Sequence, residues 1–175
     1  ITHFEKLLSL DPRTAADLLD PYLNALQLKG QLNRGLEEIL KVTGDPSVRV
    51  ALFARTALGL GALQKRQEID PFVLPLTVSA QESKRPQDYL VAVTSLRRLG
   101  KTKEAWELSE ESLRIPMDLA IRGALLLERA EILSGQGKTA EADRLCLELL
   151  KIQGLPEQIR QAAERKRADL LQKKS

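Results

Sequence analysis

Aromatic residues, cysteine and histidine are scarce in this chain. Aromatics make up 3% of its 175 residues, and Cys146 and His3 are the single cysteine and the single histidine. One cysteine cannot form an internal disulfide, and one cysteine with one histidine falls short of the roughly four ligands of a structural zinc site. Nucleophilic catalysis needs a base beside an activated serine or cysteine. We therefore expect no enzyme activity, no metal and no cofactor, with Cys146 packed in the core.

Long apolar runs are also missing. No stretch of about eighteen uninterrupted apolar residues occurs, so we expect no membrane span in this segment. The opening residues Ile1 to Lys6 do not resemble a basic region followed by an apolar signal segment. Because the chain opens on Ile1 and not on Met, we expect a fragment of a larger protein. A cytoplasmic location is favoured, and a periplasmic one fits if a signal peptide lies upstream.

The formal charge of +3 is confined to the tail. Residues 156–175 hold six basic and three acidic groups, whereas residues 1–155 hold 21 of each. No aromatic side chains interleave with the tail cations to stack on bases. A nucleic acid is therefore the less favoured partner.

The residues that are abundant predict an all-α protein. Leu, Ala, Glu, Lys and Arg lose little side-chain freedom on a helix, and apolar residues recur at helical spacing almost throughout. We predict about ten helices, at 2–10, 13–29, 31–43, 47–65, 69–83, 86–99, 101–114, 117–135, 138–153 and 156–173.

Proline, aspartate and glycine set the helix boundaries. Asp11, Asp45 and Asp70 each precede a proline and are predicted to accept hydrogen bonds from free N–H groups at helix starts. Tight reversals are expected at Gly30, Gly100 and Gly137. Two prolines fall inside predicted helices, where we expect kinks or early helix starts: Pro21 and Pro75.

A block of sequence recurs along the chain. Residues 100–105 (GKTKEA) and residues 137–142 (GKTAEA) are near copies 37 residues apart. Residues 30–35 fall in the same frame, 70 residues before the first block, which is twice 35. The unit between them, on 50–83, lacks a clear turn glycine and is degenerate. We infer a repeat of two helices.

The period near 35 and the Gly-x4-Ala turn resemble the tetratricopeptide repeat family. In the best unit, Tyr89, Leu96, Gly100 and Ala105 match positions that the family favours, while Ala92-Val93 departs from its usual Leu-Gly pair. The alternative is another α-solenoid, such as a HEAT-like array. The resemblance implies a right-handed superhelix of antiparallel hairpins in a single repeat domain, 1–175. Its parts would be a truncated leading repeat at 1–12, repeats at 13–46, 47–83, 86–117 and 118–154, and a C-terminal capping helix at 156–173.

The resemblance also implies a function, a non-catalytic scaffold that binds a peptide or helix of a partner protein. Stacked hairpins leave a concave groove, lined in this family by the first helix of each unit. The groove set expected here is Asn24, Gln27, Gln87, Thr94, Arg97, Arg98, Glu128 and Glu131. A clamp for a terminal carboxylate is not expected, because Asp20 stands where that clamp would need a lysine.

Several alternatives stay open from the sequence. The chain is either this scaffold, a nucleic-acid-associated protein acting through its basic C-terminal helix, or the regulatory arm of a larger enzyme. Trp106 either packs in the core or anchors a partner, and the cluster of Arg97, Arg98, Lys101 and Lys103 is either a solvated hairpin tip or a surface for an acidic partner. Gly59-Leu60-Gly61 indicates close helix packing, because no strand or Lys-Ser/Thr pair flanks it as in a phosphate loop.

Overall fold

The computed structural model describes residues 2–172, and this part of the chain is all helical, as predicted. It contains eleven α-helices and one short 3-10 helix, and no strand occurs within the described residues. None of these helices is long and apolar enough to cross a membrane.

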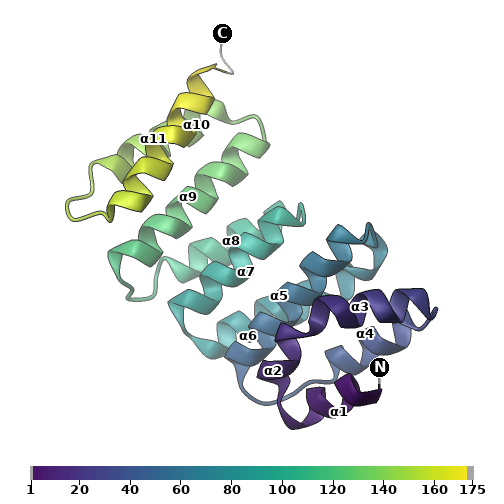
Figure 1. The fold of residues 1–175 in the computed structure, drawn as a ribbon. Coiled ribbons are helices and arrows are strands. Elements are labelled where there is room, and N and C mark those ends of the chain that lie inside the picture. Colours follow the sequence, from purple (N-terminus) through teal and green to yellow (C-terminus); the bar gives the residue numbers. More distant parts are fainter. Residues whose placement is uncertain (1, 173–175) are drawn as a thin grey trace. The chain divides into compact units, whose positions relative to one another are not determined.

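The chain divides into two compact units, Ile1–Lys101 and Thr102–Ser175 (Figure 1). The first contains α1 (Thr2–Leu10), α2 (Pro12–Asp17), α3 (Leu19–Leu28), α4 (Leu32–Leu40), α5 (Pro46–Ala62), η1 (Arg66–Glu68), α6 (Asp70–Ser83) and α7 (Pro86–Arg98). The second contains α8 (Thr102–Ser112), α9 (Leu119–Gly135), α10 (Thr139–Leu150) and α11 (Glu157–Gln172). The superhelix and the single repeat domain over 1–175 stay predictions.

Helix α5 is the centre of the first unit. It packs against α2, α3, α4, α6 and α7, and its buried side includes Leu52, Phe53 and Leu60. The Phe53 and Phe72 rings lie 6.1 Å apart between centroids, which joins α5 to α6. The buried apolar residues among those described are mostly Leu, Ala, Val and Ile. The other buried apolar residues are Phe4, Tyr22, Phe53, Phe72, Tyr89 and Cys146.

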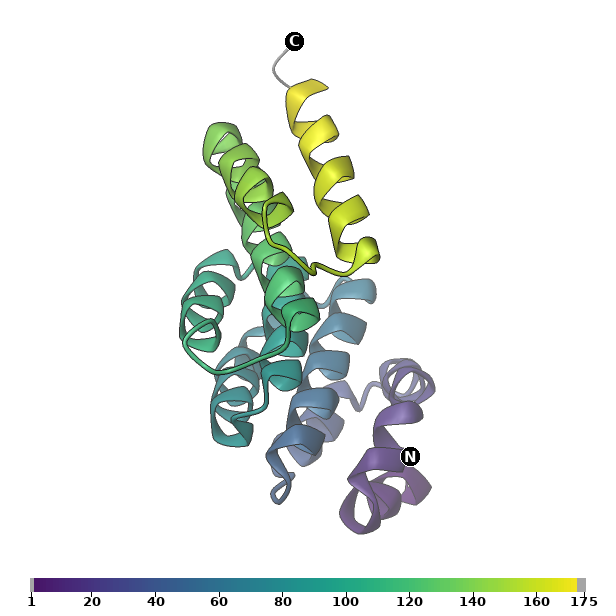
Figure 2. The ribbon, with the colours of Figure 1, turned by 90° about the vertical axis from the view of Figure 1, so that its left-hand side faces the viewer.

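The second unit is built on the α9–α10 hairpin. Helix α8 packs against α9, and α11 runs alongside both helices of the hairpin (Figure 2). Ala163 and Leu170 of the predicted capping helix are buried, whereas Leu171 is 47% exposed. Cys146 is fully buried with Ala130, Ala142 and Leu170, as expected. Burial raises the pKa of the Cys146 thiol, so this side chain is a weak nucleophile.

One turn geometry recurs four times. In each case a residue of positive φ follows a helix, and the next N–H donates to a carbonyl five residues earlier at 2.9 Å, which satisfies an otherwise free helix-end carbonyl. The pairs are Gln31–Leu26, Lys65–Leu60, Lys101–Leu96 and Lys138–Leu133. The accepting leucines lie 34, 36 and 37 residues apart. The chain is therefore a helical repeat in its turn geometry, and the unit that the sequence left degenerate has the same turn.

The degenerate unit makes this turn without glycine. Gln64 takes the left-handed position with a φ of 59°, where Gly30, Gly100 and Gly137 take it in the other three turns. A glutamine gives no signal for this backbone conformation, since glycine and asparagine are the residues that favour it. This is why the turn was not predicted.

The prediction of a single helix at 13–29 is wrong, because the helix is interrupted at Leu18 and forms α2 and α3. Pro21 would lack a hydrogen bond in an unbroken helix and would clash with the carbonyl of Asp17. The break places Pro21 in the first turn of α3, where a missing N–H costs nothing. A kink or an early helix start was predicted at this proline, and the structure has the early start.

Two of the three predicted aspartate caps are confirmed. Asp11 accepts from the Thr14 amide at 3.2 Å, and Asp45 accepts from the Ser47 amide at 2.9 Å. The prediction for Asp70 is wrong, because α6 begins at Asp70 itself after the 3-10 turn, and its carboxylate pairs with Lys101 instead.

Close helix packing at Gly59 and Gly61 is confirmed. A methyl group at Gly59 would lie 2.8 Å from Leu23 Cδ1 of α3, and one at Gly61 would lie 3.2 Å from Leu99 Cδ2 beside α7. These glycines let α5 approach its neighbours closely.

Candidate functional site

Helix α5 leaves one side open along its whole length. Five of its partly or fully exposed residues recur every three or four positions, which on a helix places these five in one line. We call this line the α5 stripe, which consists of Val48, Ala51, Arg55, Leu58 and Ala62. Four of these five side chains are apolar and small or medium in size, so the stripe is suited to contact with another polypeptide.

The first half of the α5 stripe lines a hollow of about 350 Å³, which we call the arginine pocket. Helix α2 forms one wall, and Arg85, just before α7, forms part of the other. The lining residues are Arg13, Ala16, Asp17, Ser47, Val48, Ala51, Arg55 and Arg85.

Acidic or hydroxyl groups hold each guanidinium of the arginine pocket. Arg13 Nη2 donates to Asp45 Oδ2 at 2.8 Å, and Arg55 Nη1 donates to Asp17 Oδ1 at 3.1 Å. Arg85 Nη1 donates to Ser47 Oγ at 3.2 Å. The hydrogen bond from Arg13 lowers the pKa of Asp45, and the Ser47 amide adds to this shift. Both ion pairs are exposed, so they orient the side chains more than they stabilise the fold.

The second half of the α5 stripe lines a larger hollow of about 540 Å³, which we call the tip pocket. It lies where the turn after α5 meets the end of α7. Its lining residues are Leu58, Gly61, Ala62, Arg66, Ile69, Arg98, Leu99, Gly100 and Lys101. Three of these nine are cations and none is a carboxylate.

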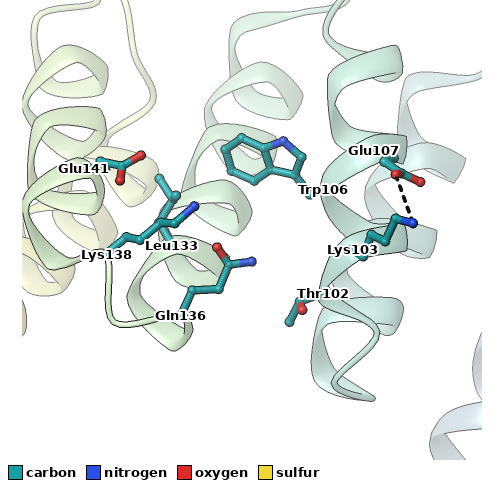
Figure 3. A pocket seen from close by; sticks show the side chains of 8 residues that line it. All are labelled: Thr102, Lys103, Trp106, Glu107, Leu133, Gln136, Lys138 and Glu141. Carbon is teal, nitrogen blue, oxygen red and sulfur yellow. Dashed lines mark ion pairs between the residues drawn. The ribbon is translucent and has the colours of Figure 1, made fainter.

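A third hollow, the Trp106 cleft, lies within the second unit and measures about 300 Å³ (Figure 3). The indole of Trp106 points from α8 into the space beside the α9–α10 turn, where Leu133, Gln136 and Lys138 lie (Figure 3). The Arg129 guanidinium carbon lies 3.8 Å from the Trp106 ring centroid, a cation–π contact. Burial lowers the pKa of Arg129.

Trp106 is half-buried, and its role as a partner anchor stays a prediction. It packs against the buried cluster around Ala142 and Cys146, yet it also lines the cleft. The charged residues of the lining are two lysines and two glutamates, and Lys103 Nζ lies 4.0 Å from Glu107 Oε1. The cleft therefore carries no excess of either charge.

The predicted groove residues do not gather at one place in either unit. Asn24 and Gln27 are exposed on α3, and Asn24 donates to the Asp20 carbonyl. Neither residue lines the arginine pocket or the tip pocket. Gln87, Thr94, Arg97 and Arg98 are on α7, and only Arg98 of these lines the tip pocket. In the second unit, Glu128 is half-buried on α9 and Glu131 pairs with Lys166 of α11.

Sequence reasoning missed the residues of α5. The expected groove set passes from Gln27 directly to Gln87, because the intervening unit lacked a turn glycine and was treated as degenerate. A signal was nevertheless present in the spacing of Ala51, Arg55, Leu58 and Ala62, which falls on one side of a helix.

The basic run of the C-terminal helix is largely engaged within its own unit. Lys166 Nζ donates to Glu131 Oε2 at 2.7 Å, and Arg167 Nε donates to Asp143 Oδ1 at 2.9 Å. Arg165 Nε donates to the Gln161 carbonyl. These contacts give the run an internal role in holding α11 to α9 and α10.

No group of three or more His, Cys, Asp or Glu side chains suited to a metal ion occurs between residues 2 and 172. Comparisons with models of known protein families, with curated proteins and with solved structures gave no significant match.

Proposed function

We propose that this chain is a non-catalytic protein-interaction module of the tetratricopeptide type, which binds a peptide or helix of a partner protein along the α5 stripe. In the repeat frame, the first helices of three successive units are the broken helix α2–α3, then α5, then α7. One observation supports the proposal. Helix α5 packs against both α2 and α7, yet the α5 stripe stays accessible and lines two hollows, the arginine pocket and the tip pocket. First helices are the groove-lining helices in an array of this kind.

The chemistry of the stripe fits a peptide ligand. Its apolar residues give a floor on which a partner's aliphatic side chains would lose contact with water. Arginines along its edges, which are enriched at protein interfaces, supply hydrogen-bond donors for backbone carbonyls and carboxylates.

The test places a photo-crosslinking amino acid at Ala51 and captures partners from cell extract. A discrete protein that cross-links at this position is then tested for direct binding to the purified chain. Ala51→Arg fills the middle of the stripe and should weaken that binding at least tenfold. Ala168→Arg, an equally exposed alanine on α11, is the matched control and should leave it unchanged. Equal weakening by both variants, or by neither, would contradict the proposal.

A further inference from the structure

Three cations from two hairpin tips meet around the tip pocket. Arg66 comes from η1, Arg98 from the end of α7, and Lys101 from the residue that closes the next turn. Lys101 pairs with Asp70 of α6. Among the described residues, no carboxylate forms an ion pair with Arg66 or Arg98, and both residues are exposed.

The helix dipole explains only part of this clustering of cations around the tip pocket. Arg98 lies in the last turn of α7, where a cation is favoured by about 0.3–1 kcal/mol through the helix dipole. That effect does not require Arg66, which belongs to a different element, to line the same hollow. The arginine pocket at the other end of the stripe differs, because each of its guanidinium groups has an acceptor.

The walls of the tip pocket narrow the class of ligand. Leu58, Ile69 and Leu99 are aliphatic, and no aromatic side chain lines the pocket for base stacking. Guanidinium groups bind carboxylates through paired hydrogen bonds. The lining therefore matches a peptide in which acidic side chains alternate with aliphatic ones.

We propose that the tip pocket binds an acidic segment of a partner polypeptide, with Arg66 and Arg98 binding its carboxylates. The pocket shares Leu58 and Ala62 with the α5 stripe, so the segment continues from the tip along α5. This assignment rests on the proposed function, since it names the chemistry of the partner at one end of that groove.

The experiment uses the whole chain and a library of labelled octapeptides in which Asp or Glu alternates with Leu, Val or Ala. A matched library carries Asn or Gln in place of the acids. Fluorescence anisotropy at low salt should select acidic members that bind at least tenfold more tightly than their amide counterparts. In amide NMR spectra, their binding should shift the Gly61 and Gly100 signals.

Arg66→Glu with Arg98→Glu should lower the affinity for the selected peptides at least tenfold. Arg122→Glu with Arg144→Glu changes the net charge equally, at two exposed arginines of the second unit, and should change the affinity less than twofold. Equal binding of acidic and amide libraries, or equal effects of the two double variants, would overturn the proposal. Tighter binding of single-stranded oligo(U), lost in the first double variant, would overturn it in favour of nucleic acid.

Cross-linking at Ala51 separates this inference from the proposed function. If a partner still cross-links at Ala51 in the Arg66→Glu, Arg98→Glu variant, the proposed groove function is supported and the assignment of the tip pocket is contradicted. Peptides that shift Gly61 and Gly100 but never cross-link at Ala51 support the tip pocket and contradict a groove along α5.

Discussion

Lys166 of α11 and Glu131 of α9 form an ion pair in which the lysine side chain is only 11% exposed. Its Nζ lies 2.7 Å from Glu131 Oε2 and joins residues 35 positions apart. Because Glu131 is 40% exposed, solvent screens the pair in part. A double-mutant cycle with Lys166→Ala and Glu131→Ala, followed by urea denaturation, should give a coupling free energy of about 1 kcal/mol. A coupling near zero would mean that this ion pair does not contribute to holding α11 against α9.

Gly123 of α9 provides the close approach for the other end of α11. A methyl group there would lie 2.8 Å from Ile159 Cγ2 and 2.9 Å from Leu155 Cδ1. Gly123→Ala should destabilise the unit by about 1 kcal/mol, because overpacking outweighs the gain in helix propensity. Gly135→Ala is the control in the same helix, with nothing within 4 Å of the new methyl group, and should stabilise by about 1 kcal/mol. Thermal denaturation distinguishes the two signs, and stabilisation by both would contradict this packing.

Gln64 adopts a left-handed backbone that is unfavourable for a residue with a side chain. Gln64→Gly should therefore raise the free energy of unfolding by about 0.5–1 kcal/mol. Gln27→Gly, on helix α3, should lower it by about 1 kcal/mol, because glycine is a poor helix former. Urea titrations of both variants measure the difference, and a loss of stability in both would contradict the turn at Gln64.

Tyr22 stacks on Phe4 with ring centroids 3.8 Å apart, and its buried hydroxyl has no hydrogen-bond partner. Burial raises the pKa of Tyr22 to about 12, and the charges of Glu5 and Glu38 add to this shift. The unfolded chain loses this proton near its ordinary pKa of about 10, whereas the folded chain keeps it to about 12. The ionisation of Tyr22 therefore leaves the free energy of unfolding unchanged below about pH 10 and lowers it as the pH rises from 10 to 12.

Tyr22→Phe should remove this part of the pH dependence. At pH 7 it should also stabilise the unit by about 1 kcal/mol, since a buried hydroxyl without a partner is removed. Urea denaturation between pH 7 and 11.5 provides the measurement. A variant that loses stability above pH 10 as steeply as the wild type would contradict the buried state of the phenol.

The helix content and most boundaries follow from local signals in the sequence. Prolines and turn glycines mark where a helix begins or ends through backbone geometry alone, and the predicted ends at Gly30, Gly100 and Gly137 rest on this. The turn at Gln64 was not predicted, because the left-handed conformation of this residue is imposed by the packing of α5 and α6 and not by its own preference.

The candidate site was less predictable than the fold. The tip pocket depends on Arg66 and Arg98 meeting across a distance of 32 residues, which no local pattern encodes. Glu131 was expected in a groove because it falls on a first helix, whereas the position of α11 decides its contact with Lys166.

The recurring turn also bears on how quickly the chain folds. Each of the four turns is closed by a bond between residues five positions apart, so little chain entropy is lost when a hairpin forms. Contacts close in sequence favour rapid folding, and in a repeat protein each hairpin offers a place for folding to begin. Folding would then start at any of several turns and spread to neighbouring helices, without waiting for one long-range encounter.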